Sequence, residues 1–385
     1  MFYLYYEPIS DYNQLMTLYN WQQPDWPHFQ YDLSGIQEDL FSIAEKMGLI
    51  SGKLNHLSEH LQTEALIDLM VEEAIKTSLI EGERININDV RSSIKNKLGL
   101  NKKPVTVKDK LAQGISELML DVRKTFKQSL TEKKLLNWHL MLLSGSYNPH
   151  LRIASWRMDE EAMQIVSGYH GKWVVHYEAP PANRVPDEMR QYIRWFNQSA
   201  PGKQKAISLA PVRAAIAHLY FESIHPFDDG NGRIGRAIAE KALSQGFGYP
   251  IMLSLSQAIE ANKKAYYDAL KIASRSNDVT EWIHYFVKVI LNAQNTVEAQ
   301  IHFILKKSLF FRQYEKKLNE RQLKVINKMM QAGVKGYEGG MSAKKYMKIT
   351  DISKATATRD LQDLLEMGAF KQIGEGRSVR YELNV

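Results

Sequence analysis

His225-Pro-Phe-Asp-Asp-Gly-Asn-Gly-Arg-Ile-Gly-Arg236 is the most informative segment of this 385-residue chain. The surrounding pattern predicts that a helix over residues 210–224 leads into it, and that a second helix over 231–246 begins within it. Glycines at the start of a helix let backbone N–H groups face a ligand, and the helix dipole favours an anion there. The segment therefore predicts a phosphate site between two helices.

The side chains of the segment add chemistry to this predicted phosphate site. Arg233 and Arg236 lie three residues apart, so they share one helix face and can reach the same phosphate chain. A carboxylate from the pair Asp228-Asp229 can hold Mg²⁺ beside phosphates. His225 has the pKa range of a base that takes a proton from a hydroxyl. A plain glycine turn is the alternative, but this combination favours phosphoryl or nucleotidyl transfer.

The segment resembles the signature of the Fic family, His-Pro-Phe-x-Asp-Gly-Asn-Gly-Arg-x-x-Arg, and every fixed position is filled. Asp228 occupies a variable position and receives no role. The resemblance covers about residues 60–300. It implies that His225 is the general base, that Phe227 is a buried anchor, that Asp229 holds Mg²⁺, that Gly230, Asn231 and Gly232 cradle the phosphates of ATP, and that Arg233 and Arg236 bind its β- and γ-phosphates.

Two flanking segments extend the resemblance. The sequence ANKKAYYDAL resembles a later helix of the family and implies that Asn262, Tyr266 and Tyr267 flank the nucleoside. Two short β-prone runs surround SGYHGK and predict a hairpin over residues 163–177. In the family, the corresponding flap pins a target segment by strand addition.

A further motif, Thr77-Ser-Leu-Ile-Glu81-Gly82, ends a region predicted to be helical over residues 35–82. It resembles the inhibitory helix of the family, Ser/Thr-x-x-x-Glu-Gly/Asn, in its N-terminal arrangement. If Glu81 pairs with Arg236, that arginine cannot hold the γ-phosphate, and ATP lies in an unproductive pose. The alternative is an ordinary helix C-terminus, with Gly82 as the stop.

The C-terminal fifth of the chain carries the basic excess. Residues 306–385 hold 17 Lys and Arg against 9 Asp and Glu, whereas the whole chain has a net charge of +7. A helix over 320–331, a second helix over 353–367 and a hairpin over 369–383 predict a winged helix-turn-helix. Arg359 and Arg377 are its candidate contacts with a partner. DNA and protein remain alternative partners.

The composition limits the kinds of catalytic and metal sites, and the compartment, that are expected for this chain. The chain has no cysteine, which excludes disulfides, thiolate metal sites and cysteine nucleophiles. No secretory signal and no apolar run of membrane-spanning length is evident, so a cytoplasmic protein without membrane contact is expected. The expected fold is mainly α. The expected domains are an N-terminal helical extension over residues 1–105, a helical Fic core with one hairpin over 106–305, and a winged helix over 306–385.

The resemblance implies an enzyme that uses Mg²⁺ and moves AMP from ATP to a Ser, Thr or Tyr hydroxyl of a target protein, restrained by Glu81. Removal of AMP, or transfer of a phosphate or another nucleotide, is an alternative at the same site. A DNA-binding regulator with an ATP-sensing Fic core is an alternative of another class. The sequence leaves open the target, the preferred nucleotide, what releases Glu81, and self-association into a homodimer.

Overall fold

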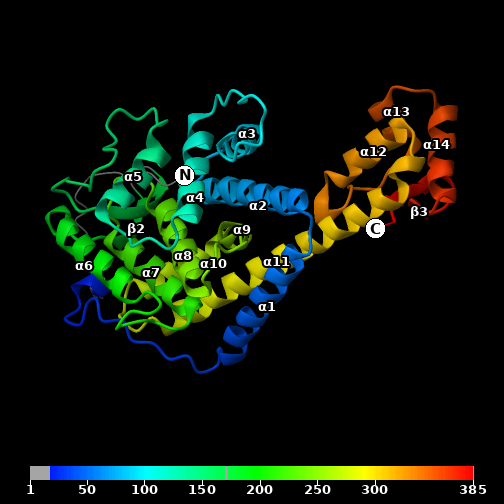
Figure 1. Cartoon of the computed structure of the whole chain (residues 1–385). Helices are drawn as coiled ribbons and strands as arrows, with labels where there is room; N and C mark the ends of the chain where they lie inside the picture. The colour runs from blue at the N-terminus through cyan, green and yellow to red at the C-terminus, as the bar shows by residue number, and fades with distance from the viewer. Residues whose placement is uncertain (1–17, 170–171, 385) are drawn as a thin grey trace. The chain divides into compact units, whose positions relative to one another are not determined.

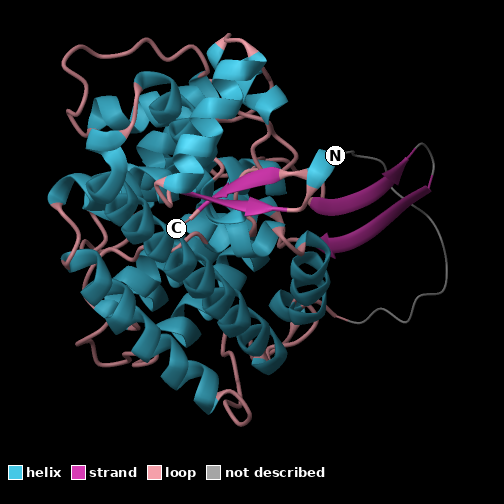
Figure 2. Ribbon diagram, turned by 90° about the vertical axis from the view of Figure 1, so that its right-hand side faces the viewer, coloured by secondary structure: helices cyan, strands magenta, loops and turns pink. Residues whose placement is uncertain are grey.

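The computed structural model describes residues 18–169 and 172–384. Within these residues the fold is mainly α-helical, with two separate two-stranded hairpins, as expected from the sequence (Figure 2). No helix in the described ranges combines the length and the apolar character that crossing a membrane requires.

The chain divides into two compact units (Figure 1). One consists of Met1–Gly48 and Leu66–Gln294, and the other of Leu49–Ala65 and Asn295–Val385. Three helices, α1 (Gln37–Asn55), α2 (Glu59–Ile80) and α11 (Thr280–Tyr314), contribute residues to both units.

The centre of the first unit is α7 (Ala210–Ile224), which is buried on nearly every face. A helix with apolar residues all round must lie inside a core, and α8 (Asn231–Phe247) packs along it. The short loop between α7 and α8 therefore lies against the core. The other elements of this unit are α3 (Ile87–Lys97), α4 (Lys110–Lys124), α5 (Glu132–Leu143), β1 (Gln164–Tyr169), β2 (Lys172–Glu178), α6 (Val185–Gln198), α9 (Leu255–Glu260) and α10 (Lys263–Ala273).

The segment before α1 packs on this core through aromatic side chains. The indole N–H of Trp21 donates to the carbonyl of Glu178 at 2.8 Å, and that of Trp26 donates to Glu188 at 2.9 Å. Trp26 also meets Tyr220 of α7 edge to face, with ring centroids 5.0 Å apart. Both tryptophans thus combine an apolar body with a satisfied polar tip.

The hairpin expected over residues 163–177 is present as β1 and β2. The strands pair antiparallel, with Gln164 opposite Glu178 and an irregularity between Ile165 and Val166. No third strand joins this sheet among the described residues, so each strand keeps an open edge. Residues 170 and 171 lie outside the described residues.

Several predicted helix boundaries were wrong. The expected helix over 35–82 is two helices, because the chain breaks at residues 56–58. Within residues 84–104 the sequence predicts a turn and cap at NINDV and a loop at NKKP, and both are present, but the cap begins a helix, α3, that was not predicted. Its cap is Asn86, whose side chain accepts from the backbone N–H groups of Asn88 and Asp89. The sequence also predicts helices over residues 256–275 and 279–305. The first is divided into α9 and α10, and the second, α11, continues to Tyr314.

The second unit contains a helix-turn-helix followed by a hairpin. The sequence predicts that Ala357, Leu361, Leu364 and Leu365 form the buried face of the second helix. The first three are buried, Leu365 is only partly buried, and Gly368 ends the helix with a positive φ of 74°. An additional helix, α13, lies where none was predicted. The elements are α12 (Glu320–Met330), α13 (Ala343–Thr350), α14 (Lys354–Glu366), β3 (Phe370–Ile373) and β4 (Arg380–Leu383).

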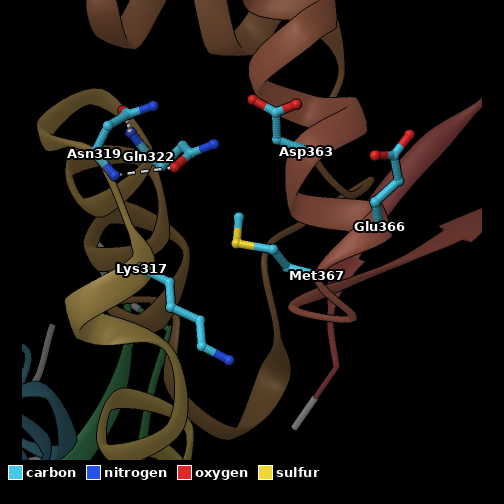
Figure 3. A pocket seen from close by; sticks show the side chains of 6 residues that line it. All are labelled: Lys317, Asn319, Gln322, Asp363, Glu366 and Met367. Carbon is cyan, nitrogen blue, oxygen red and sulfur yellow. Dashed lines mark hydrogen bonds between the residues drawn. The ribbon is translucent and has the colours of Figure 1, made fainter.

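Asp360 of α14 links this helix to α12 and α13. The Arg321 guanidinium donates to both of its oxygens at 2.8 and 2.9 Å, and Tyr346 donates to it at 3.0 Å. The hydrogen bonds from Arg321 hold the pKa of Asp360 below its usual range. A nearby hollow of about 470 Å³ is lined from the start of α12 and the end of α14 (Figure 3). Its lining residues are Lys317, Asn319, Gln322, Asp363, Glu366 and Met367.

Candidate active site

The loop between α7 and α8 is held in a defined shape by its own residues. His225 ends α7 in the left-handed region, with φ 50° and ψ 59°, which turns the chain sharply after the helix. Asn231 then closes the loop. Its side-chain oxygen accepts from the N–H of Phe227 at 3.0 Å, and its side-chain nitrogen donates to the carbonyl of Phe227 at 2.8 Å. The Asn231 side chain therefore shapes the loop.

Phe227 and His139 anchor the loop to α5. Both side chains are fully buried, and their rings stack with centroids 4.0 Å apart. The N–H of Ala154 donates to Nδ1 of His139 at 3.0 Å, so Nε2 carries the proton that is donated to the carbonyl of Asp229 at 3.1 Å. Burial lowers the pKa of His139 to about 4, which keeps this arrangement neutral.

His225 lies in a nearly enclosed environment with a carboxyl group close by. Its side chain is 15% exposed, and its Nδ1 is 3.8 Å from Oε2 of Glu222. Burial and then the positive charge of Arg157 lower the pKa of His225 to about 4. Burial also raises the pKa of Glu222 to about 8. At neutral pH the imidazole is therefore unprotonated and able to accept a proton.

The start of α8 presents backbone donors beside a carboxylate. Gly230 adopts a positive φ of 84°, and its N–H donates to Oδ1 of Asp229 at 2.6 Å. The first N–H groups of a helix have no intrahelical acceptor, so those of Asn231, Gly232 and Arg233 are suited to an anion. The Asp229 side chain is 46% exposed and stands beside this helix end.

Arg233 is buried and lies between two carboxylates. Its guanidinium forms an ion pair with Glu83 and a second one with Asp229, whose Oδ1 is 3.3 Å away. The side chain is only 2% exposed. Glu83 lies just beyond the predicted inhibitory motif, and no pattern in the sequence singles it out.

Arg236 is held by the residues that end α2. Its Nε donates to the Thr77 hydroxyl at 2.8 Å, and its Nη2 donates to Oε1 of Glu81, also at 2.8 Å. Glu81 follows the last helical residue of α2, and Gly82 takes a positive φ of 83°. The Glu81 carboxylate lies so close to Gly232 that a β-carbon there would come within 2.3 Å of Oε1. The space over the start of α8 is thus partly filled by this carboxylate.

The three residues expected to flank a nucleoside lie at the start of α10. Asn262 is exposed and caps this helix by accepting from the N–H of Ala265 at 3.3 Å. Tyr266 is buried, with its hydroxyl 2.8 Å from Nε2 of His218. Tyr267 donates to the carbonyl of Ile80 at 3.4 Å, which brings it close to Glu81.

The two predicted partner contacts of the second unit lie on separate elements. Arg359 is exposed on α14, together with Lys354 and Thr358. Arg377 lies in a short 3-10 helix, Gly376–Ser378, and its side chain is outside the described residues.

Five side chains that contact the loop or its arginines were not singled out as functional in the sequence. Glu222 lies one helical turn before His225 on α7, whereas the other four come from segments distant in sequence and are brought near by the fold. Arg152 pairs with Asp228 at 3.2 Å, which gives the variable position of the signature a partner. The five are Glu83, His139, Arg152, Arg157 and Glu222.

Asp229 is the residue of this site whose side chain could hold Mg²⁺. Asp229 supplies one partly exposed carboxylate, with Oδ1 engaged by Gly230 and Arg233. The described residues contain no cluster of three His, Asp or Glu side chains that could hold a metal by themselves. Mg²⁺ is commonly bound by one or two carboxylates together with substrate phosphates and water. Asp229 at the start of α8 fits that mode of binding.

Comparison with known proteins supports the resemblance to the Fic family. Residues 129–243 match the family model described as Fic/DOC family. Residues 19–100 match a domain of unknown function, and residues 337–384 match the C-terminal domain of DIP2311-like transcriptional regulators.

Individual relatives include a Fido domain-containing protein from Dictyostelium discoideum, which is 33% identical over 114 residues. That match covers 29% of this chain and 73% of the relative. The protein adenylyltransferase Fic of Drosophila ananassae is 26% identical over 209 residues, which are 54% of this chain but only 37% of that protein. A Fic family protein from Desulfovibrio desulfuricans has the same fold, with a TM-score of 0.52 at 21% identity, covering 92% of this chain and 98% of that one.

One conclusion about the family of this chain follows from the signature loop, the helical fold around it and these matches. The chain belongs to the Fic/DOC family, and it is a distant homologue of protein adenylyltransferases.

Proposed function

We propose that this chain transfers AMP from ATP to a Ser, Thr or Tyr hydroxyl of a target protein, and that Glu81 restrains the reaction. One observation carries the proposal. His225, Asp229 and the first N–H groups of α8 lie together with Arg233 and Arg236, and Glu81 holds Arg236 at 2.8 Å.

The phosphates of ATP are proposed to lie over the start of α8. Backbone N–H groups of Gly232 and its neighbours face them there, and the helix dipole adds positive potential. Arg233 and Arg236 bind the β- and γ-phosphates. The nucleoside is proposed to lie at the start of α10, with Asn262, Tyr266 and Tyr267 as its candidate contacts. Asp229 would hold Mg²⁺, which supplies charge neutralisation for the phosphate chain.

His225 is proposed to act as the general base. Its imidazole takes the proton of the target hydroxyl as that oxygen attacks the α-phosphorus of ATP. The bond between the α-phosphorus and the bridging oxygen breaks, and pyrophosphate leaves against Arg233 and Arg236. The open edges of β1 and β2 suit a target segment that adds as a strand.

Glu81 is proposed to restrain this reaction by occupying Arg236. Its carboxylate lies over Gly232, in the space that a γ-phosphate would need. An ATP molecule that cannot engage Arg236 would be shifted along its phosphate chain, and its α-phosphorus would be misaligned for attack. Displacements of about 1 Å can cost such reactions about 100-fold in rate.

The nature of the transferred group tests the proposal. A Glu81→Gly chain is incubated with Mg²⁺ and ATP labelled at the α- or the γ-phosphate, and the protein is analysed by intact mass. We expect the protein to gain AMP with the α-label and to retain no γ-label. Retention of the γ-label would indicate phosphate transfer, and loss of AMP from an adenylylated protein incubated with the chain that keeps Glu81 would indicate hydrolytic removal of AMP instead. If no label is retained and no AMP is removed, the transferase proposal is wrong.

DNA binding by the second unit is a second candidate function. Its described surface carries exposed cations on two adjacent helices, Lys344 and Lys348 on α13 and Lys354 and Arg359 on α14. None of these four forms an ion pair with another described residue, so their charges are available to phosphates. A helix of such a unit commonly enters the major groove. The match to a transcriptional regulator domain agrees with this candidate.

The salt dependence of DNA retention tests this second candidate. Replacing Arg359 and Arg377 by Ala should reduce the slope of log K against log salt by about 1.8, because each lost phosphate contact removes about 0.9. Lys203→Ala/Lys205→Ala changes the same charge on exposed residues of the first unit and should leave the slope unchanged. Equal losses in both double variants would instead indicate non-specific attraction, and retention of a protein but not of DNA would indicate protein docking.

A further inference from the structure

Arg157 is a buried cation whose hydrogen bonds converge on the end of α7. It lies between α5 and β1, and the residue is only 3% exposed. Its Nε donates to the carbonyl of His225 at 2.8 Å, and its backbone N–H donates to the carbonyl of Pro226 at 2.9 Å. Its Nη2 reaches the carbonyls of Pro180 and Ile224.

Two of these contacts, to the carbonyls of Ile224 and His225, satisfy groups that the end of α7 leaves unpaired. The last carbonyl groups of a helix have no intrahelical donor, and a cation there also complements the helix dipole. His225 stands at this end in a left-handed conformation, which a residue with a β-carbon rarely adopts. The Arg157 guanidinium therefore stabilises an uncommon backbone conformation at His225, the residue whose side chain must point toward the substrate.

The same guanidinium joins α7 to the hairpin. Pro180 follows β2, which ends at Glu178, so one side chain bridges the end of the hairpin and the His225 backbone. A second link lies beside it, because the Tyr177 hydroxyl donates to the carbonyl of Ser223 at 2.5 Å. The position of His225 is thus fixed relative to the strand that leaves the hairpin.

We propose that Arg157 is a positioning residue for His225, which fixes the backbone of the base relative to the hairpin that presents the target hydroxyl. This inference rests on the proposed transferase function. The charge of Arg157 has a second effect, because it opposes protonation of the imidazole. The other charged or titratable groups that face His225 are Glu222 on α7, Glu81 after α2, and Asp229 in the loop.

The experiment compares Arg157→Met and Arg157→Lys in a Glu81→Gly chain. We expect Arg157→Met to lower kcat for AMP transfer by at least about 10-fold, because a misplaced base loses its alignment. The KM for ATP should change by less than about 3-fold, since the phosphates are held elsewhere. Arg157→Lys keeps the charge but cannot bridge several carbonyls, so kcat should fall by less than in Arg157→Met.

A titration of His225 by NMR gives a readout that does not depend on activity. The His225 signal is assigned by its loss in His225→Ala. In Arg157→Met the pKa of His225 should rise by about 0.5–1 unit, because a nearby like charge has been removed. In Arg157→Lys it should stay close to that of the parent chain.

Arg213 provides the matched control, because it is another buried arginine that donates to backbone carbonyls. It lies in α7, is 1% exposed and donates to the carbonyl of Phe196 at 2.8 Å. Arg213→Lys and Arg213→Met should lower thermal stability without changing kcat or the His225 titration. Equal losses of kcat in the Arg157 and Arg213 variants would reduce Arg157 to a stability residue and overturn the proposal.

The remaining outcomes are also decisive. If Arg157→Met does not fold, the loss of kcat in folded Arg157→Lys at unchanged KM carries the test. If the Glu81→Gly parent transfers no AMP, the proposed function has failed. In that case the inference about Arg157 is tested by the NMR titration of His225 in a folded variant that lacks the positive charge of Arg157, either Arg157→Gln or Arg157→Met. An unchanged pKa of His225 there would overturn it.

Discussion

Replacing His225 by Ala in a Glu81→Gly chain should lower the rate of AMP transfer by about 10²–10⁴-fold, the usual contribution of a general base. ATP affinity should remain close to that of the parent. The phosphates are proposed to be bound by Arg233, Arg236 and the start of α8, and none of these groups depends on the imidazole. The measurement is the initial rate with α-labelled ATP, together with ATP affinity by calorimetry.

His302→Ala is the control for this prediction, because His302 is exposed on α11 and should be replaceable without loss. A chain without His225 that still transfers AMP at the parental rate would assign the base elsewhere. Loss of both transfer and ATP affinity would point to a collapsed loop, which a thermal melt of the variant would reveal.

Replacing Glu81 by Gly should raise the rate of AMP transfer by about 10- to 150-fold over the unmodified chain. The hydrogen bond from Arg236 to Glu81 is charge-assisted and largely buried, and such bonds contribute about 1.5–3 kcal/mol. Its loss frees Arg236 for the γ-phosphate and clears the space over Gly232. The rate with α-labelled ATP at a fixed protein concentration measures the gain.

Glu83→Gln is the matched comparison, because it removes a carboxylate from the same segment and leaves the pair of Glu81 and Arg236 intact. We expect a smaller gain from it than from Glu81→Gly. Equal gains would show that release of Arg233 or general loosening of the segment, rather than release of Arg236 alone, activates the chain. No gain in either variant would contradict the restraint.

The sequence predicted the centre of the fold well, because strong local signals coincide there. The helix over 210–224 was predicted within its observed bounds, since it is mostly apolar and ends at a histidine followed by proline. The helix over 231–246 begins at a glycine turn and ends one residue later than predicted. Both elements are long enough for their pattern to be unambiguous.

Short helices were the main failure of the prediction. Helix α13 has only eight residues, Ala343–Thr350, and Tyr346 is its one fully buried side chain among the described residues. Such a helix is too short for a repeating apolar pattern to be recognised. Its N-cap, Ser342, which accepts from the N–H of Lys345, was the signal that remained available.

The candidate site was predictable only where its residues are close in sequence or belong to a known motif. Glu83, His139 and Arg157 are at least 68 residues from the parts of the site that they contact, so their proximity depends on the packing of α2 and α5 around α7 and α8. The Asn231 side chain illustrates a second limit. Its position in the signature suggested contact with phosphate, whereas its amide is engaged by the backbone of Phe227.

The two hydrogen bonds of Asn231 also affect how the protein ages. An asparagine followed by glycine is the pair most prone to deamidation, in which the next backbone nitrogen attacks the side-chain carbonyl and ammonia is lost. Here Phe227 binds both polar atoms of the side chain, and this restrains the rotation that ring closure needs. An aspartate at position 231 would put an acceptor against the Phe227 carbonyl and loosen the loop. We therefore expect the rate of deamidation at Asn231 to follow how often this loop opens.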